Sequence, residues 1–123
     1  MELQSNKLGD KGVEVLSTNT AWTNLKLLNL KLNGIGDSGI AFLSQNSTWI
    51  ELQELNLSRN AISTKGAVIL SKNSTWINIT KLDLAGNSIQ TEGATALKHN
   101  MSWSQMKELI PWSVSASPTR EGY

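Results

Sequence analysis

The chain repeats a unit of 27 residues four times, and this periodicity limits its possible folds more than any other feature. The period is plainest in tryptophan, at Trp22, Trp49, Trp76 and Trp103. Further series with the same interval are a glycine series (Gly12, Gly39, Gly66, Gly93), a leucine series (Leu16, Leu43, Leu70, Leu97), a first asparagine series (Asn6, Asn33, Asn60, Asn87) and a second asparagine series (Asn19, Asn46, Asn73, Asn100). Series that stay in phase predict a repeat array, in which each unit buries its apolar side against its neighbours.

Each unit predicts a short strand followed by a short helix. Leu28-Asn29-Leu30 alternates apolar and polar residues, as a half-buried strand does, and the pattern recurs at 55–57 and 82–84. The apolar stretch that follows in each unit suits the inner side of a helix. We expect each helix to begin after an N-cap whose side-chain oxygen accepts a free backbone N–H. The candidate N-caps are Asp10, Asp37, Thr64 and Thr91.

Each periodic series has a predicted structural role. The second asparagine series would end the helices in the left-handed conformation, which asparagine tolerates better than most residues. The first asparagine series follows the strands, where its amides would satisfy buried loop backbone groups of adjacent units. Glycine in the first helical turn would let helix and strand approach closely. The tryptophans are expected in the core as a filler common to all units, the alternative being an exposed stacking platform for nucleic acid or carbohydrate.

The consensus of the units is L-x-L-x-x-N-x-I-x-x-x-G-x-x-x-L-x-x-N-x-x-W-x-x-L, which resembles the leucine-rich repeat. A strand–helix unit with glycine in the helix is most similar to the ribonuclease-inhibitor-like subfamily, which includes repeat domains of NOD-like receptors and bacterial effectors. The resemblance implies an α/β fold, a right-handed solenoid curved like a horseshoe segment, with parallel strands on its concave face and short helices on its convex face. The units would span about 1–27, 28–54, 55–81 and 82–108 within a domain of residues 1–110, followed by a flexible C-terminal tail at 111–123.

Composition argues against catalysis and against charge-driven binding. The chain has no cysteine and one histidine, which removes thiolate metal sites, cysteine nucleophiles and most histidine-based arrangements. Eleven Lys+Arg against ten Asp+Glu leave a net charge of +1, so no strong field attracts nucleic acid or an anionic membrane. His99 occupies a polar helix-end position, where a cation suits the helix dipole. We therefore expect no enzyme activity, no cofactor, no metal ion, and no nucleic-acid or membrane partner.

The sequence also contains no recognisable targeting signal. Residues 1–10 are polar and lack the apolar centre of a signal peptide, and no stretch approaches the length of a membrane span. The expected location is the cytoplasm. A secreted effector that is exported without a cleaved signal peptide is the other location compatible with the sequence.

The concave strand face is the surface on which the family resemblance implies ligand binding. One row of its outward-facing positions starts at Glu2 in the first unit. Lys31 and Arg59 would anchor an acidic group of a protein partner, and Asn56 and Asp83 would accept hydrogen bonds. The predicted partner-binding residues are Asn29, Lys31, Glu54, Asn56, Ser58, Arg59, Lys81 and Asp83.

Two interpretations of function remain open. The side chains of these rows vary between units while the core does not, as on a recognition surface, but solvated positions vary as freely. The alternatives are a non-catalytic protein-interaction scaffold and a structural fragment of a longer repeat array that has no ligand of its own. The end units lack a recognisable cap, which would permit self-association through the ends of the array.

Two smaller features have more than one interpretation. Trp112 lies outside the tryptophan series and would either cover the open end of the last unit or mark an exposed contact patch. N-x-S/T sequons are acceptor motifs for N-glycosylation. The lack of a signal peptide makes glycosylation the less favoured interpretation of them. The sequons lie at Asn46, Asn56, Asn73, Asn78 and Asn100.

Overall fold

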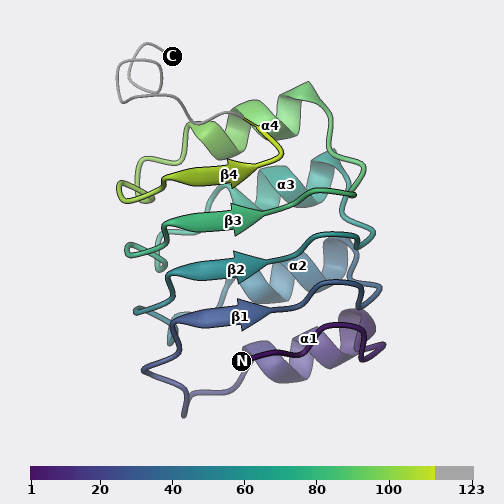
Figure 1. Ribbon diagram of the computed structural model, residues 1–123, viewed down its shortest axis with the longest axis vertical. Helices are drawn as coiled ribbons and strands as arrows, with labels where there is room; N and C mark the ends of the chain where they lie inside the picture. Colours follow the sequence, from purple (N-terminus) through teal and green to yellow (C-terminus); the bar gives the residue numbers. More distant parts are fainter. Residues whose placement is uncertain (113–123) are drawn as a thin grey trace.

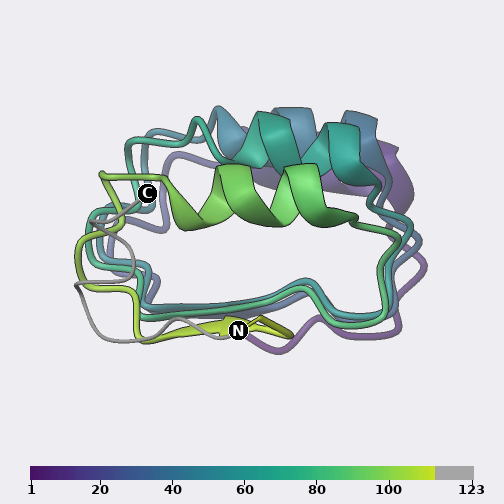
Figure 2. The same ribbon diagram turned by 90° about the horizontal axis from the view of Figure 1, so that it is seen from above.

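The computed structural model describes residues 1–112, which form two layers (Figure 1). Strands lie one above another on one face and helices cover the other, as the view from above shows (Figure 2). The helices are α1 (Gly9–Ser17), α2 (Asp37–Ser44), α3 (Thr64–Leu70) and α4 (Thr91–Lys98), and the strands are β1 (Leu27–Asn29), β2 (Glu54–Asn56), β3 (Lys81–Asp83) and β4 (Glu108–Ile110). The predicted α/β class is confirmed. Among residues 1–112, no helix has both the length and the apolar character needed to span a membrane.

The strands form one parallel sheet in the order β1-β2-β3-β4. Each residue pairs with the residue 27 positions later, so that Leu27 lies beside Glu54 and Glu54 beside Lys81. The amino-terminal segment extends this sheet, because Glu2 bridges to Asn29 in the same parallel sense. Equivalent side chains of successive units therefore form rows across the sheet, which makes the row the natural element of any binding surface.

The core lies between the two layers and is continuous along the stack. It contains one row of strand leucines, Leu28, Leu55, Leu82 and Leu109, all at most 1% exposed. Trp49, Trp76 and Trp103 are fully buried, which confirms the predicted core role, and Trp22 of the first unit is half-buried. All three tryptophans belong to the one continuous core, so the same residue type fills the same repeat position in successive units.

The predicted N-caps are wrong, and three of these side chains (Asp10, Asp37 and Thr64) instead accept hydrogen bonds at the start of the next unit's helix. The residues lie inside the first turn of their own helices, and the N-cap positions are Leu8, Gly36, Ser63 and Gln90. Asp10 Oδ1 accepts hydrogen bonds from Gly36 N–H at 2.6 Å and Gly39 N–H at 3.0 Å. Asp37 likewise accepts from Ser63 N–H at 2.8 Å. Neighbouring helices start side by side, so a side chain in one first turn reaches the free N–H groups of the next.

Two glycines of the series, Gly39 and Gly66, leave room for this inter-unit capping. A Cβ atom on Gly66 would lie 2.2 Å from Asp37 Oδ1, and one on Gly39 would lie 2.6 Å from Asp10 Oδ1. The predicted close approach is present, but the nearest neighbour is a carboxylate of the preceding unit rather than a strand. Glycine therefore leaves room for the cap of its own helix.

The left-handed helix ends predicted for the second asparagine series are also wrong. The helices end before these residues, and the left-handed non-glycine residues among positions 1–112 are Ser5, Lys7, Leu32 and Arg59. Asn46 is instead buried, and its Nδ2 donates to the Ser17 carbonyl of the preceding unit at 2.8 Å. Its Oδ1 accepts from Thr48 N–H and Trp49 N–H, both at 2.9 Å. An amide can serve donors and acceptors at once, so asparagine satisfies a loop that turns inward without a left-handed residue.

The first asparagine series has the role that the sequence predicts. Asn60 Oδ1 accepts from Asn33 N–H at 2.9 Å and Ile35 N–H at 3.0 Å in the preceding unit. Its Nδ2 donates to the carbonyls of Leu30 at 3.1 Å and Leu57 at 2.9 Å. One side chain thus satisfies backbone groups of two units at the bend that follows the strands.

The end of the chain differs in part from the predicted flexible tail. Trp112 pairs with Leu109 in an isolated antiparallel bridge and packs, half-buried, against the core. It therefore covers the last unit, the first of its two interpretations, and the predicted tail is wrong at this residue. Residues 113–123 of the predicted tail lie outside the described part of the chain.

Three of the five sequon asparagines are buried residues with a structural role. Asn46, Asn73 and Asn100 are buried, since they belong to the second asparagine series, and an attached glycan has no room there. Asn78 is exposed, and its Nδ2 donates to the Ile50 carbonyl at 2.9 Å. The N-x-S/T pattern therefore arises mainly from the loop geometry that the series stabilises.

We predict that Asn60→Ala lowers the free energy of unfolding by about 3 kcal/mol or more, because it leaves several sheltered backbone groups without partners. Urea unfolding followed by circular dichroism measures this change. Asn24→Ala is the matched control, and we expect about 0.5 kcal/mol or less from this exposed position. Equal losses in the two variants would contradict the inter-unit role of Asn60.

We predict that Gly66→Ala destabilises the chain by about 1–3 kcal/mol, although alanine is the better helix former, because the added methyl group displaces the Asp37 carboxylate. The same unfolding assay applies. Ser38→Ala, at an exposed position of α2, should leave stability unchanged or raise it slightly. A Gly66→Ala variant as stable as the wild type would argue against inter-unit capping.

Candidate binding face on the parallel strands

The outer side of the sheet, which we call the strand face, presents two rows of side chains to solvent. Residues on either side of each buried strand leucine project outward, because side chains alternate along a strand. The first row consists of Leu27, Glu54, Lys81 and Glu108, and the second consists of Glu2, Asn29, Asn56, Asp83 and Ile110. These rows bring together residues that lie far apart in the sequence.

A shallow hollow of about 150 Å³, the strand-face hollow, lies over β1, β2 and β3. It brings together five of the predicted partner-binding residues, namely Asn29, Glu54, Asn56, Lys81 and Asp83. Glu2 and Leu27 also line it, together with the strand residues Leu28 and Leu55. The residues that gather here come from four units, so only the stacked array creates the hollow.

The second row is held by hydrogen bonds to the chain that leaves each strand. Asn29, Asn56 and Asp83 each accept, through Oδ1, the N–H two residues further on, at 3.1, 2.9 and 3.0 Å respectively. Asn56 Oδ1 also accepts from the Ser58 hydroxyl at 2.6 Å. The predicted acceptor role of Asn56 is therefore wrong, since both lone pairs of its oxygen are used, whereas Asp83 keeps its second carboxylate oxygen.

Three predicted binding residues lie outside the hollow, past the carboxyl ends of the strands. Ser58 is only 5% exposed and bonded to Asn56, so its predicted exposure is wrong. Lys31 is half-buried, and Arg59 is exposed with a left-handed φ of 55°. Arg59 N–H donates to the Ala85 carbonyl at 2.7 Å, and a Cβ atom on Gly86 would lie 3.0 Å from Arg59 Cγ, so Arg59 lies against the neighbouring unit. Lys31 and Arg59 thus form a separate basic margin of the strand face.

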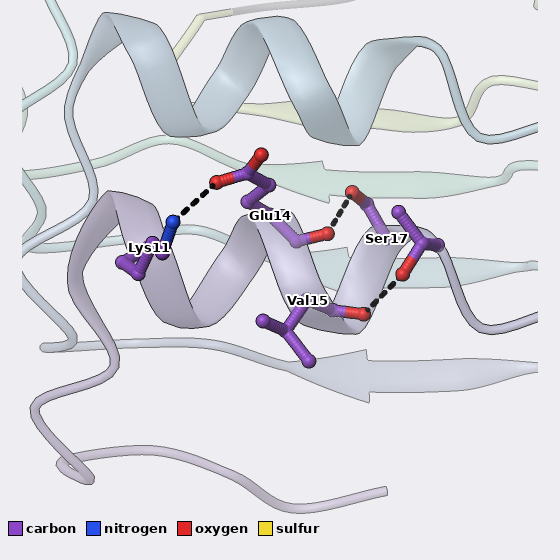
Figure 3. Close-up of polar contacts among 5 residues, drawn as sticks. Lys11, Glu14, Val15 and Ser17 are labelled. Carbon is purple, nitrogen blue, oxygen red and sulfur yellow. Dashed lines mark hydrogen bonds and ion pairs between the residues drawn. The ribbon is translucent and has the colours of Figure 1, made fainter.

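The charges of the strand face are not neutralised by ion pairs within residues 1–112. The one ion pair in this part of the chain joins Lys11 Nζ and Glu14 Oε1 at 3.5 Å on the exposed side of α1 (Figure 3). Glu2, Glu54 and Asp83 therefore keep charge that can act on a partner. Asn29 Nδ2 donates to Glu2 Oε1 at 3.0 Å, which orients that carboxylate along the second row.

Sequence comparison identifies the family that this geometry suggests. A family profile described as Leucine Rich repeat matches residues 2–17, 23–44, 52–71 and 77–98, which together are more than half of the chain. The chain belongs to the leucine-rich repeat family. Comparison with curated proteins gave no match. Each matched segment covers one strand position and the helix that follows it. The profile and the fold therefore describe the same periodicity.

The described part of this leucine-rich repeat chain has no arrangement suited to a metal ion. Within residues 1–112, no three His, Asp or Glu side chains are grouped closely enough to hold one. Whether the chain lacks enzyme activity or a cofactor stays a prediction. The chemistry that the repeat rows offer is charge and hydrogen bonding on a solvent-exposed surface.

Sequence reasoning missed two exposed apolar residues in the loops that lead into β2 and β3 of this repeat array. Ile50 and Ile77 are 50% and 52% exposed and follow the core tryptophans directly. They lie 27 residues apart, and the bond from Asn78 to the Ile50 carbonyl joins their loops. The repeat interval itself is the signal that could have found them, because two large exposed residues at one repeat position are adjacent in space.

We predict that Asp83→Asn leaves stability unchanged, because Asn29 and Asn56 already hold the same turn in the neighbouring repeats. Asp83→Ala should instead lower the free energy of unfolding by about 1 kcal/mol through loss of the bond from Ala85 N–H. Chemical denaturation of both variants tests this. A destabilised Asp83→Asn variant would show that the negative charge, rather than the turn, holds this position.

Proposed function

We propose that the chain is a non-catalytic protein-interaction scaffold whose partner docks on the strand face. The observation that carries the proposal is the strand-face hollow, where charged side chains without ion pairs converge from several units. Leucine-rich repeats are generally protein-interaction modules, which supports a protein partner. The repeated core supplies a rigid frame, and the side chains that differ between units supply recognition.

The size of the strand face limits what it does alone. Four strands spaced about 4.8 Å apart, with two or three outward residues each, give on the order of 200 Å². A standard interface uses about 800 Å² per partner. The partner must therefore also contact the margins, where Lys31 and Arg59 lie on one side and Ile50 and Ile77 on the other.

Two finer assignments belong to the same proposal. The helix in every unit, with glycine in its first turn, supports the ribonuclease-inhibitor-like type of leucine-rich repeat. A cysteine-free chain suits the reducing cytoplasm, and we place the protein there or among effectors exported without a cleaved signal peptide. Neither assignment changes the surface that contacts the partner.

The alternative is a structural segment of a longer array without a ligand of its own. One observation favours it: apolar residues of the first unit are half-buried, whereas their equivalents in the second are fully buried. The half-buried residues are Leu8, Leu16, Trp22 and Leu25, and their equivalents are Ile35, Leu43, Trp49 and Leu52. A further unit, or a second copy associating through this end, would complete their burial.

Charge reversal separates the two functions. We first identify the partner by photo-crosslinking from benzoylphenylalanine at position 54, and then measure its binding to two double variants. Lys31→Glu with Arg59→Glu should weaken binding at least about tenfold, because both cations border the docking surface. Lys65→Glu with Lys72→Glu, at exposed positions in α3 and just after it, changes the net charge equally and should have no effect.

Unfolding curves of both double variants establish that neither has lost its fold. A strand face that crosslinks no protein, or equal loss of binding in the two double variants, would favour the structural segment over the interaction scaffold.

A further inference from the structure

The strand-face hollow has a charge that selects one kind of partner. Glu2, Glu54 and Asp83 face it with three negative charges, and Lys81 contributes one positive charge. The imbalance is local, because the whole chain carries a net charge of +1. A group that enters the hollow is therefore attracted if it is positively charged, whereas the basic margin beyond the strands attracts the opposite sign.

The dimensions of the hollow admit a single side chain. Its space of about 150 Å³ lies well below the roughly 300–1,000 Å³ of a typical small-molecule pocket. A helix or a folded loop is too large to enter, whereas one long side chain fits. Arginine suits the site better than lysine, because its five donors can bind several carboxylate oxygens at once.

The neutral groups of the hollow favour an extended backbone next to that side chain. Both lone pairs of Asn56 Oδ1 are used by Ser58, which leaves Asn56 Nδ2 as a donor toward the partner. A backbone carbonyl is the acceptor that every extended segment offers. The same short segment can therefore place a basic side chain among the carboxylates and a carbonyl on Asn56.

The margins set the order in which a segment lying along the strands meets apolar, acidic and basic side chains. Leu27, Ile50 and Ile77 are exposed before or at the amino ends of the strands, and Lys31 and Arg59 lie beyond their carboxyl ends. A segment lying along the strands thus meets an apolar margin, then the carboxylates, and then the cations. Arg59 lies three residues after Asn56 in the sequence. An extended partner spans the distance between them with about three residues of its own.

From these observations we propose that the strand face binds an extended peptide segment ordered apolar, basic, acidic, with an arginine side chain in the strand-face hollow. The apolar side chain rests on Ile50 and Ile77, and the acidic side chain meets Lys31 and Arg59. This inference rests on the proposed function and specifies the chemistry of its partner. It identifies the hollow as the position that distinguishes one partner from another.

The test is an NMR titration of the ¹⁵N-labelled chain with the capped peptide Ac-Leu-Gly-Arg-Gly-Gly-Glu-NH₂. The matched probe has citrulline in place of arginine, which keeps the shape and removes the charge. We expect saturable shifts concentrated at the amides of Glu54, Asn56 and Asp83 for the arginine peptide, and binding at least tenfold weaker for the citrulline peptide.

Two carboxylate double variants make the titration specific. Glu54→Gln with Asp83→Asn should weaken the arginine peptide at least tenfold, and Asp83→Asn preserves the turn to Ala85 that the asparagines of the row already make. Glu14→Gln with Glu92→Gln, on α1 and α4, removes the same charge from the helix layer and should leave binding unchanged.

Each other result overturns the inference. Equal binding of the two peptides would exclude a charge-selective hollow, shifts spread evenly over the helix layer would indicate nonspecific attraction, and no shift with either peptide would remove the site. Failure of the proposed function gives a different result from failure of this inference, because the strand face then crosslinks no native protein. If a protein is captured there while the arginine and citrulline peptides bind equally, the proposed scaffold function stands and the arginine-selective hollow is refuted.

Discussion

The structure depends on hydrogen bonds that side chains of one unit make to the backbone of the next. Only three residues in each unit form strand, so most of the chain between strand and helix is irregular and partly buried. Burying such backbone without partners costs about 1–3 kcal/mol for each group. The two asparagine series provide those partners at both bends of the unit, with Asn60 and Asn46 as examples. Stacking of apolar side chains supplies the driving force for folding. The amides allow the chain to bend within the stack, because they satisfy the backbone groups that the bends bury.

The same logic links residue types that seem unrelated in the sequence. A carboxylate in the first turn of one helix caps the next helix, and the glycine of that next helix leaves room for it. Where the pairing changes, both partners change: Thr64 replaces the aspartate and accepts from Gln90 N–H at 2.9 Å, and Gly93 then faces the Ala67 methyl group. Contact between units thus explains Gly39, Gly66 and Gly93, although glycine weakens an isolated helix.

Periodicity predicted the order of elements, the buried tryptophans and the role of Asn60, because these depend on one unit or on stacking as such. It failed where a periodic residue acts on the next unit. Asp10 looks like a local N-cap, since a series at intervals of 27 is equally consistent with a contact inside the unit and one 26 residues away. The strand face was predicted in the same way. Its rows follow from the repeat, but Ser58 is bonded to Asn56 rather than exposed, and no residue type reveals that in advance.

The proposed recognition rests on a constant frame that carries rows of differing side chains. The turns that hold Asn29, Asn56 and Asp83 fix these side chains before any partner arrives, so little conformational entropy is lost when they bind. An array that repeats its frame can change one row residue without disturbing the fold, as Asp83 at an asparagine position shows. Specificity therefore depends on where such exceptions lie relative to one another. In the proposed function, Glu54, Lys81 and Asp83 lie together around the hollow, so one group of the partner meets all three.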